Sequence, residues 1–221
     1  MSFSAEQLAS VRPVWQRILE HPFLLETRDG TIAEDTFKTW MRQDYLFVQA
    51  AIPFIAALLA RAPLEHRSAL SQALPALQQE LELFRTRAAA AEVDLDAVRP
   101  FFTNHAYIQF LIATAHSASF AEGFTVLYVA EKAYLDSWMV VKAGIDRGSQ
   151  WYPFVQNWTS DAFVGWVDHL EQRLDELAEE AGPRERDRMA RLFELTARYE
   201  LAFWEMAATG EGWPGLDVEA L

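Results

Sequence analysis

The sequence predicts an all-α bundle of about seven helices, and three observations support this fold class. Apolar residues recur at steps of three and four along most of the chain, which is the period of a helix that buries one face. Clusters of Gly, Pro, Asn and Asp interrupt this pattern at intervals that match ordinary helix lengths. The alternation of apolar and polar residues that marks a half-buried strand is nearly absent.

Capping boxes predict three of the helix starts. In this motif a Ser or Thr at the helix start is followed three residues later by Glu or Gln, and each side chain bonds the backbone of the other. The motif occurs at Ser4, Thr31 and Ser119. The helix that begins at Ser4 is expected to end near His21, because Pro22 disfavours helical backbone in the residue before it.

Prolines predict the other boundaries and two irregularities. The helix from Thr31 runs to about residue 60 and should kink at Pro53, because proline cannot donate to the carbonyl of the preceding turn. The next helix, over about 64–92, contains Pro75, where we expect a kink or a break. The remaining helices are predicted over about 100–116, from Ser160 and from Pro183.

Length and composition bound the class of protein. A chain of 221 residues can bury one sizeable core, so we expect a single domain over 1–221, with a tail at 210–221 that is either loosely ordered or docked through Trp213. The net charge of −13 argues against binding to nucleic acid or to an anionic membrane. With no cysteine, the chain has neither disulfides nor a thiolate nucleophile, and we expect a cytoplasmic location. We find no hydrophobic signal core and expect no bilayer-spanning run.

One acidic residue of the last predicted helix lies on the face that should be buried. The stripe on this face consists of Met189, Phe193, Thr196, Glu200, Phe203 and Ala207. An ionised carboxylate is costly to bury without a partner, so such a residue usually has a raised pKa or a bound ligand. The alternative is that Glu200 extends to solvent or pairs with an Arg.

Two further acids repeat this pattern on other helices. Asp44 shares its stripe with Phe37, Trp40, Met41, Val48, Ala51 and Ile55, whereas Glu131 shares its stripe with Phe120, Phe124, Leu127, Tyr134 and Trp138. A short carboxylate such as that of Asp44 cannot extend to solvent as a long side chain can. Three such acids flanked by aromatic residues predict an enclosed polar site with aromatic walls. The alternative is that one or more of them faces a subunit contact or an Arg.

We predict neither a metal centre nor a cofactor. A di-iron bundle needs Glu-x-x-His on two helices, and no Glu here stands three residues before a His. The histidines are scattered, at positions 21, 66, 105, 116 and 169. His21 could ligate a haem in principle, but no basic cluster surrounds it to bind the propionates. A pocket that acts with carboxylates, phenols and ring stacking suits a small, flat, nitrogen-rich base.

These residues resemble the motifs of the TenA (thiaminase II) family, whose fold is similar to that of haem oxygenase. The motifs are Trp15 with His21-Pro22-Phe23, FKTWMRQDYLF around Asp44, AYIQFL around Tyr107, AEKAY at 130–134, and YELAFWEMA around Glu200. They follow one another in the family's order over almost the whole chain. Such a series is far more specific than any one motif alone.

The resemblance implies a role for each matching residue. Asp44 matches the aspartate that binds the aminopyrimidine ring, and Glu200 matches the family's acid/base. Tyr107 and Tyr134 match tyrosines that line the ring. Trp158 stands where the family has another tyrosine, so a hydroxyl group is lost there. We expect Tyr107, Tyr134, Trp158 and Phe47 to wall the same cavity.

The sequence departs from the family at the nucleophile. Ala130 stands at the position of the family's cysteine, and the chain has no cysteine anywhere. It therefore resembles the cysteine-less subgroup, in which a glutamate is thought to serve instead, and Glu131 is the candidate. Members of this subgroup are linked to the salvage of degraded thiamin pyrimidines rather than to the cleavage of thiamin itself.

Three functions are compatible with these features. The first is hydrolysis of an amino- or formylamino-methyl pyrimidine for thiamin salvage, in which Asp44 binds the ring, Glu200 is the acid/base and Glu131 assists water or the leaving amine. The second is a non-catalytic pyrimidine-binding or regulatory protein, and the third is an oxygenase-like or haem-binding bundle. Glu200 favours the first, because binding the ring would need only Asp44 and the stacked aromatics. The resemblance also implies a homodimer or homotetramer.

Overall fold

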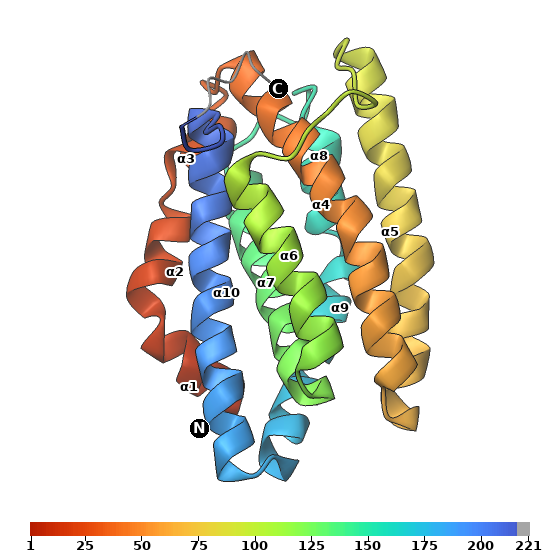
Figure 1. The fold of residues 1–221 in the computed structure, drawn as a ribbon. Helices are drawn as coiled ribbons and strands as arrows, with labels where there is room; N and C mark the ends of the chain where they lie inside the picture. The colour runs from red at the N-terminus through yellow and green to blue at the C-terminus, as the bar shows by residue number, and fades with distance from the viewer. Residues whose placement is uncertain (216–221) are drawn as a thin grey trace. The chain divides into compact units, whose positions relative to one another are not determined.

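The computed structural model describes residues 1–215, and this part of the chain contains ten α-helices (Figure 1). They are α1 (Phe3–Ser10), α2 (Arg12–Leu19), α3 (Pro22–Asp29), α4 (Glu34–Arg61), α5 (Leu64–Ala90), α6 (Phe102–Ser117), α7 (Phe120–Lys142), α8 (Tyr152–Trp158), α9 (Asp161–Glu180) and α10 (Pro183–Thr209). The all-α fold class is confirmed. The number exceeds the expected seven mainly because the N-terminal region forms three helices instead of one.

The N-terminal breaks have local causes. α1 ends before Val11, and Pro13 in the first turn of α2 has no N–H to donate to the preceding turn. The N-cap of α1 is Ser2 rather than Ser4, because the Ser2 side chain accepts a hydrogen bond from the N–H of Ala5. Ser4 is buried instead, and its Oγ donates to Asp175 at 2.9 Å.

Later boundaries agree better with the predictions. α4 begins at Glu34, after the expected Thr31, with Ala33 at its N-cap. The helix continues through Pro53, and α5 likewise continues through Pro75, so the break considered at Pro75 does not occur. The last two helices match the prediction: the Ser160 hydroxyl accepts from the N–H of Phe163 to cap α9, and Pro183 is the first residue of α10.

The chain divides into two compact units, each built from two separate segments. The first unit comprises residues 1–32 and 121–204, in which α1 packs against α2 and α9, and α8 packs against α9. Side-chain hydrogen bonds tie its helices together: the Tyr128 hydroxyl donates to Glu171 at 3.0 Å, and the Trp15 indole donates to Asp136 at 3.0 Å.

The second unit comprises residues 33–120 together with the segment that begins at Glu205. Its centre is α4, which packs against α5 and α6 (Figure 1). α5 runs antiparallel to α4, and the rings of Trp40 and Tyr45 both contact Phe84, at 5.7 and 6.2 Å. α6 runs parallel to α4. The prediction of one domain over 1–221 stays a prediction.

One described helix, α4, is long and apolar enough to cross a membrane by length and composition alone, with a mean hydropathy of 1.4 over 18 residues. The expectation that no segment reaches this length therefore does not hold for α4. In the structure α4 packs against α5 and α6 and buries Trp40, Phe54 and Leu58. A core helix of a globular protein meets the same criteria, so this feature is weak evidence for a membrane.

The segment after α10 docks onto the second unit as far as residue 215. The indole Nε1 of Trp213 donates to the carbonyl of Pro100 at 3.0 Å, and its ring contacts Phe102 and His105. The Thr103 hydroxyl donates to Glu211 at 2.9 Å. Of the two expectations for this tail, docking through Trp213 is thus correct for residues 210–215, and residues 216–221 lie outside the described part of the chain.

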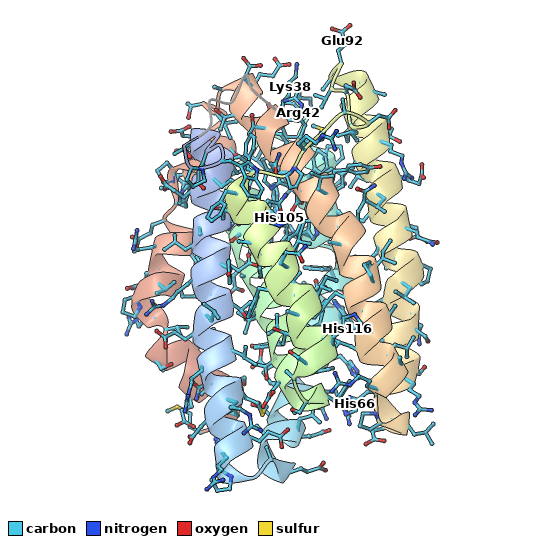
Figure 2. All side chains as sticks on the ribbon, viewed as in Figure 1. Lys38, Arg42, His66, Glu92, His105 and His116 are labelled. Atoms are coloured by element: carbon cyan, nitrogen blue, oxygen red, sulfur yellow. The ribbon has the colours of Figure 1, made fainter. Side chains whose placement is uncertain are left out.

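Glu92, which follows α5, is the one non-glycine residue within 1–215 with a positive φ, of 55°. Figure 2 shows its side chain pointing away from the end of α5. The left-handed conformation lets the N–H of Val93 reach the Ala88 carbonyl at 2.8 Å, but a side chain there is strained. We expect Glu92→Gly to raise the free energy of unfolding by about 1 kcal/mol, and the melting temperature by about 2–4 °C.

Thermal denaturation followed by circular dichroism measures this gain. The matched control is Glu92→Ala, which removes the same negative charge but keeps the Cβ atom. An equal gain in both variants would assign the effect to charge in this acidic chain, and not to backbone strain.

Candidate functional site

The predicted site residues are divided between the two units. Asp44, Phe47 and Tyr107 belong to the second unit, and Glu131, Tyr134, Trp158 and Glu200 belong to the first. The structure shows which of them meet within each unit. The convergence of Asp44, Glu131 and Glu200 on one pocket stays a prediction.

Glu200 is buried, as its helical stripe predicts. Only 1% of the residue is exposed, and the five apolar or hydroxyl-bearing members of its stripe on α10 are each exposed by 1% or less. The Glu200 carboxylate therefore does not extend to solvent. The next turn of the helix places Phe203 and Trp204 beside it, both of them buried. Glu200 is thus a carboxyl group buried beside two aromatic side chains.

Tyr134 lies at the centre of an aromatic cluster in the first unit. Its ring is stacked on Trp204 at 5.5 Å, contacts Phe203 at 6.5 Å, and meets Trp158 edge-on at 5.5 Å. Trp158 is itself stacked on Trp138 at 5.1 Å and is only 2% exposed. The structure therefore places Tyr134 in contact with Trp158 and with the turn of α10 that follows Glu200.

Glu131 is half-buried, although its stripe predicts a central buried position. Loss of hydration at its carboxyl group raises the pKa to about 7, and a hydrogen bond with the Trp166 side chain of α9 opposes part of this rise. The Trp166 ring is in turn stacked on His169 at 6.3 Å. The contact with Trp166 directs Glu131 toward α9. A carboxyl group with a pKa of about 7 can both donate and accept a proton near neutral pH.

This pKa predicts a pH-dependent contribution of Glu131 to folding. Between the unperturbed pKa of 4.5 and the folded value of about 7, the folded state holds a proton that the unfolded state has lost. The stability from this group is therefore complete below pH 4.5 and is lost as the pH rises through about 7. We therefore expect the unaltered protein to lose stability relative to Glu131→Gln as the pH rises from about 5 to about 8. The melting temperature of the variant minus that of the unaltered protein should increase over this range.

The exposed Glu179 on α9 offers the control, because Glu179→Gln makes the same chemical change in solvent. The difference in melting temperature between Glu179→Gln and the unaltered protein should stay constant over this pH range. If Glu131→Gln also shows a constant difference, the carboxyl group at position 131 is not desolvated.

In the second unit, Asp44 is fully buried, with no measurable exposure. It lies one turn before Phe47 on α4, and the Phe47 ring contacts that of Tyr107 on α6 at 4.8 Å. Tyr107 is 1% exposed. The structure therefore confirms the predicted burial of Asp44. It also shows a ring contact between Phe47 and Tyr107, one turn after Asp44 on α4. That these residues wall one cavity with Tyr134 and Trp158 stays a prediction.

Sequence reasoning missed the network that fixes this contact. The Gln43 side chain donates to the Arg99 carbonyl at 3.0 Å and accepts from the N–H of Phe101 at 2.9 Å. Asn104 on α6 donates from Nδ2 to the Gln43 main-chain carbonyl at 2.8 Å. All of these bonds surround the residue next to Asp44. The available signal was Asn104 itself, a polar residue one turn before Tyr107 on the buried face of α6.

The histidines do not form a metal site in residues 1–215, where no three His, Cys, Asp or Glu side chains gather in a way that could hold a metal ion. Figure 2 shows His105 and His116 at different heights along α6 in the second unit. His21 is buried and has a local structural role, because its Nδ1 accepts from the N–H of Phe23 at 3.3 Å and caps α3.

Known proteins resemble this chain in sequence and in fold over almost its whole length. An aminopyrimidine aminohydrolase of Halalkalibacterium halodurans is 30% identical to this chain over 96% of the chain and 98% of the relative. The solved structure of a TenA homologue from Pyrococcus furiosus is 33% identical, with a TM-score of 0.90, and the match covers 93% of this chain and 99% of that one.

A more distant solved structure shows the fold alone. A domain with a haem-oxygenase-like fold from Shewanella denitrificans has a TM-score of 0.74 at 14% identity, over 92% of this chain and 90% of that domain. A model of the TENA/THI-4/PQQC family matches residues 8–210. These residues include all seven predicted site residues. The chain therefore belongs to the TENA/THI-4/PQQC family.

Proposed function

We propose that this protein hydrolyses thiamin-derived aminopyrimidines, by removing an amino or formylamino group from the methylene carbon attached to the ring. The burial of Glu200 beside an aromatic cluster carries this proposal, because a binding protein for a flat base has no need of a second buried acid. The name of the Halalkalibacterium halodurans relative, which the chain matches almost end to end, supports the same chemistry.

Asp44 holds the ring in this proposal. Its carboxylate accepts hydrogen bonds from the exocyclic amine and from a protonated ring nitrogen, and charge-assisted bonds of this kind are strong in a buried setting. Phe47 and Tyr107 supply apolar ring surface against which the pyrimidine stacks.

Glu200 transfers the protons. As water attacks, a C–O bond forms and the C–N bond breaks; the leaving nitrogen takes a proton from the acid, and the attacking water gives one up. A buried glutamate can fill both roles in turn. Glu131, whose pKa is about 7, assists either the water or the leaving amine. No thiolate takes part, because Ala130 occupies the position of the family's nucleophile.

The proposal is tested by incubating the purified protein with a panel of pyrimidines and following the products by mass spectrometry. The panel contains thiamin, the aminomethyl pyrimidine and the formylaminomethyl pyrimidine. We expect hydroxymethyl pyrimidine from both the second and the third compound, with release of ammonia from the second and of formamide from the third, and little product from thiamin. Binding of the panel without any turnover would favour the non-catalytic alternative.

We further propose that the protein is a cytoplasmic homodimer or homotetramer that acts on small molecules and binds neither nucleic acid nor membranes. The net charge of −13 supports the absence of polyanionic partners. Light scattering coupled to size-exclusion chromatography measures the assembly state, and a monomeric mass would contradict this part of the proposal.

A further inference from the structure

The orientation of one buried amide, that of Gln43, is fixed by the main chain. Its Nε2 lies 3.0 Å from the carbonyl oxygen of Arg99, and its Oε1 lies 2.9 Å from the N–H of Phe101. A carbonyl can only accept and an N–H can only donate. Exchanging the two ends of the amide would therefore place an acceptor against the Arg99 carbonyl and a donor against the Phe101 N–H. Gln43 therefore presents its oxygen, and not its nitrogen, toward the start of α6.

The Gln43 amide fixes that of Asn104 in turn. The Nδ2 of Asn104 lies 2.8 Å from the main-chain oxygen of Gln43 and 3.0 Å from its Oε1. Both atoms are acceptors, so only the NH₂ end of Asn104 can face them. The carbonyl oxygen of Asn104 therefore points away from Gln43.

This oxygen has no donor within the described residues. Asn104 has no measurable exposure, and its Oδ1 is buried without a hydrogen-bond partner. A buried acceptor without a donor is costly, and native proteins rarely keep one that serves no purpose. The arrangement of Gln43 and Asn104 thus holds an acceptor in a fixed direction inside the second unit.

Asn104 lies at the same helix contact as the residues assigned to the pyrimidine. The Asn104 amide contacts the carbonyl of the peptide group that joins Gln43 to Asp44. One turn further along each helix, Phe47 of α4 contacts Tyr107 of α6. Asp44 and Phe47 on α4 and Asn104 and Tyr107 on α6 therefore occupy adjoining turns of two parallel helices.

We propose that the Asn104 side-chain carbonyl is a specificity-determining acceptor that takes one N–H of the exocyclic amine of an aminopyrimidine. This inference rests on the proposed function and adds a specificity residue to the same site. An aromatic amine carries two hydrogens, and the Asp44 carboxylate takes only the one that lies beside the ring nitrogen. The second hydrogen needs another acceptor, which Asn104 provides. An oxo group in place of the amine presents lone pairs to Asn104 and is rejected.

The test compares two probes by isothermal titration calorimetry, 4-amino-2-methylpyrimidine and 2-methylpyrimidin-4-one. We expect the unaltered protein to prefer the amine. In Asn104→Leu, affinity for the amine should fall by roughly five- to tenfold, the value of one hydrogen bond, whereas affinity for the oxo compound should not fall. The control is Thr114→Val, a change from polar to apolar at another buried position of α6, which should leave the preference unchanged.

A second variant separates loss of the acceptor from loss of the fold. In its protonated form, Asn104→Asp presents an O–H toward Gln43 and keeps the carbonyl oxygen, so it should retain the preference for the amine. Melting curves establish that each variant is folded. The inference is overturned if folded Asn104→Leu keeps the full preference, as it would if the oxygen only held a buried water, or if the unaltered protein binds both probes equally. Failure of the unaltered protein to bind the amine at all would overturn the proposed function as well.

Discussion

Replacing Glu200 by glutamine should lower kcat for the aminomethyl pyrimidine by about 10²–10⁴-fold and leave the affinity for pyrimidines nearly unchanged. Glutamine keeps the shape and hydrogen-bonding capacity of the side chain, but it cannot carry a proton between water and the leaving amine. Steady-state kinetics give kcat, and calorimetry with the product pyrimidine gives the affinity. A loss confined to kcat is the result that distinguishes a proton carrier from a residue that only shapes the site.

Two further variants make this result specific. Glu194→Gln changes an exposed glutamate on the same helix, where Glu194 pairs with Arg198, and should be without effect on kcat. If Glu200→Gln turns over at the unaltered rate, the acid/base role passes to Glu131, and Glu131→Gln should then show the large loss.

The second large effect concerns Asp44. We expect Asp44→Asn to weaken the binding of an aminopyrimidine by about 1.5–3 kcal/mol, or about 10- to 150-fold, which is the range for hydrogen bonds to a charged group. The amide keeps the volume of the carboxylate but lacks the charge that favours a protonated ring nitrogen. Calorimetric titration measures the change directly.

The matched control for Asp44 lies on the same helix. Asp35 is exposed in the first turn of α4, so Asp35→Asn removes the same charge without touching the buried face. Its affinity should equal that of the unaltered protein. Equal affinities in Asp44→Asn and Asp35→Asn would show that Asp44 does not bind the ring.

The helical stripes predicted the burial of both Asp44 and Glu200. On α10 the reason is a distinct polar face, so that position on the stripe determines exposure. The same reasoning was less accurate on α7, where Glu131 is half-buried. All residues from 121 to 129 are buried, so this part of the helix has no polar face against which to define a stripe. The buried acid of α7 is Glu122, which forms a salt bridge with Arg188 of α10.

The network around Gln43 could not be predicted from the sequence for a different reason. Its bonds join residues more than 50 positions apart, and they depend on which end of each amide faces which backbone group. Periodicity reports the face on which a residue lies, but it carries no information about such pairings. Local signals were sufficient elsewhere, as at Ser160, where the residue that caps a helix lies next to it in the sequence.

The docked segment after α10 has a consequence for the order of events during synthesis. The second unit combines residues 33–120 with the segment that begins at Glu205, so it cannot be completed until the 84 residues 121–204 have been added. At about 5–20 residues per second, this takes roughly 4–17 s. During that interval the start of α6 lacks the Trp213 ring that later contacts Phe102. A nascent chain stalled before Glu211 would therefore present this aromatic surface to chaperones, and the second unit would close only after the first has been translated.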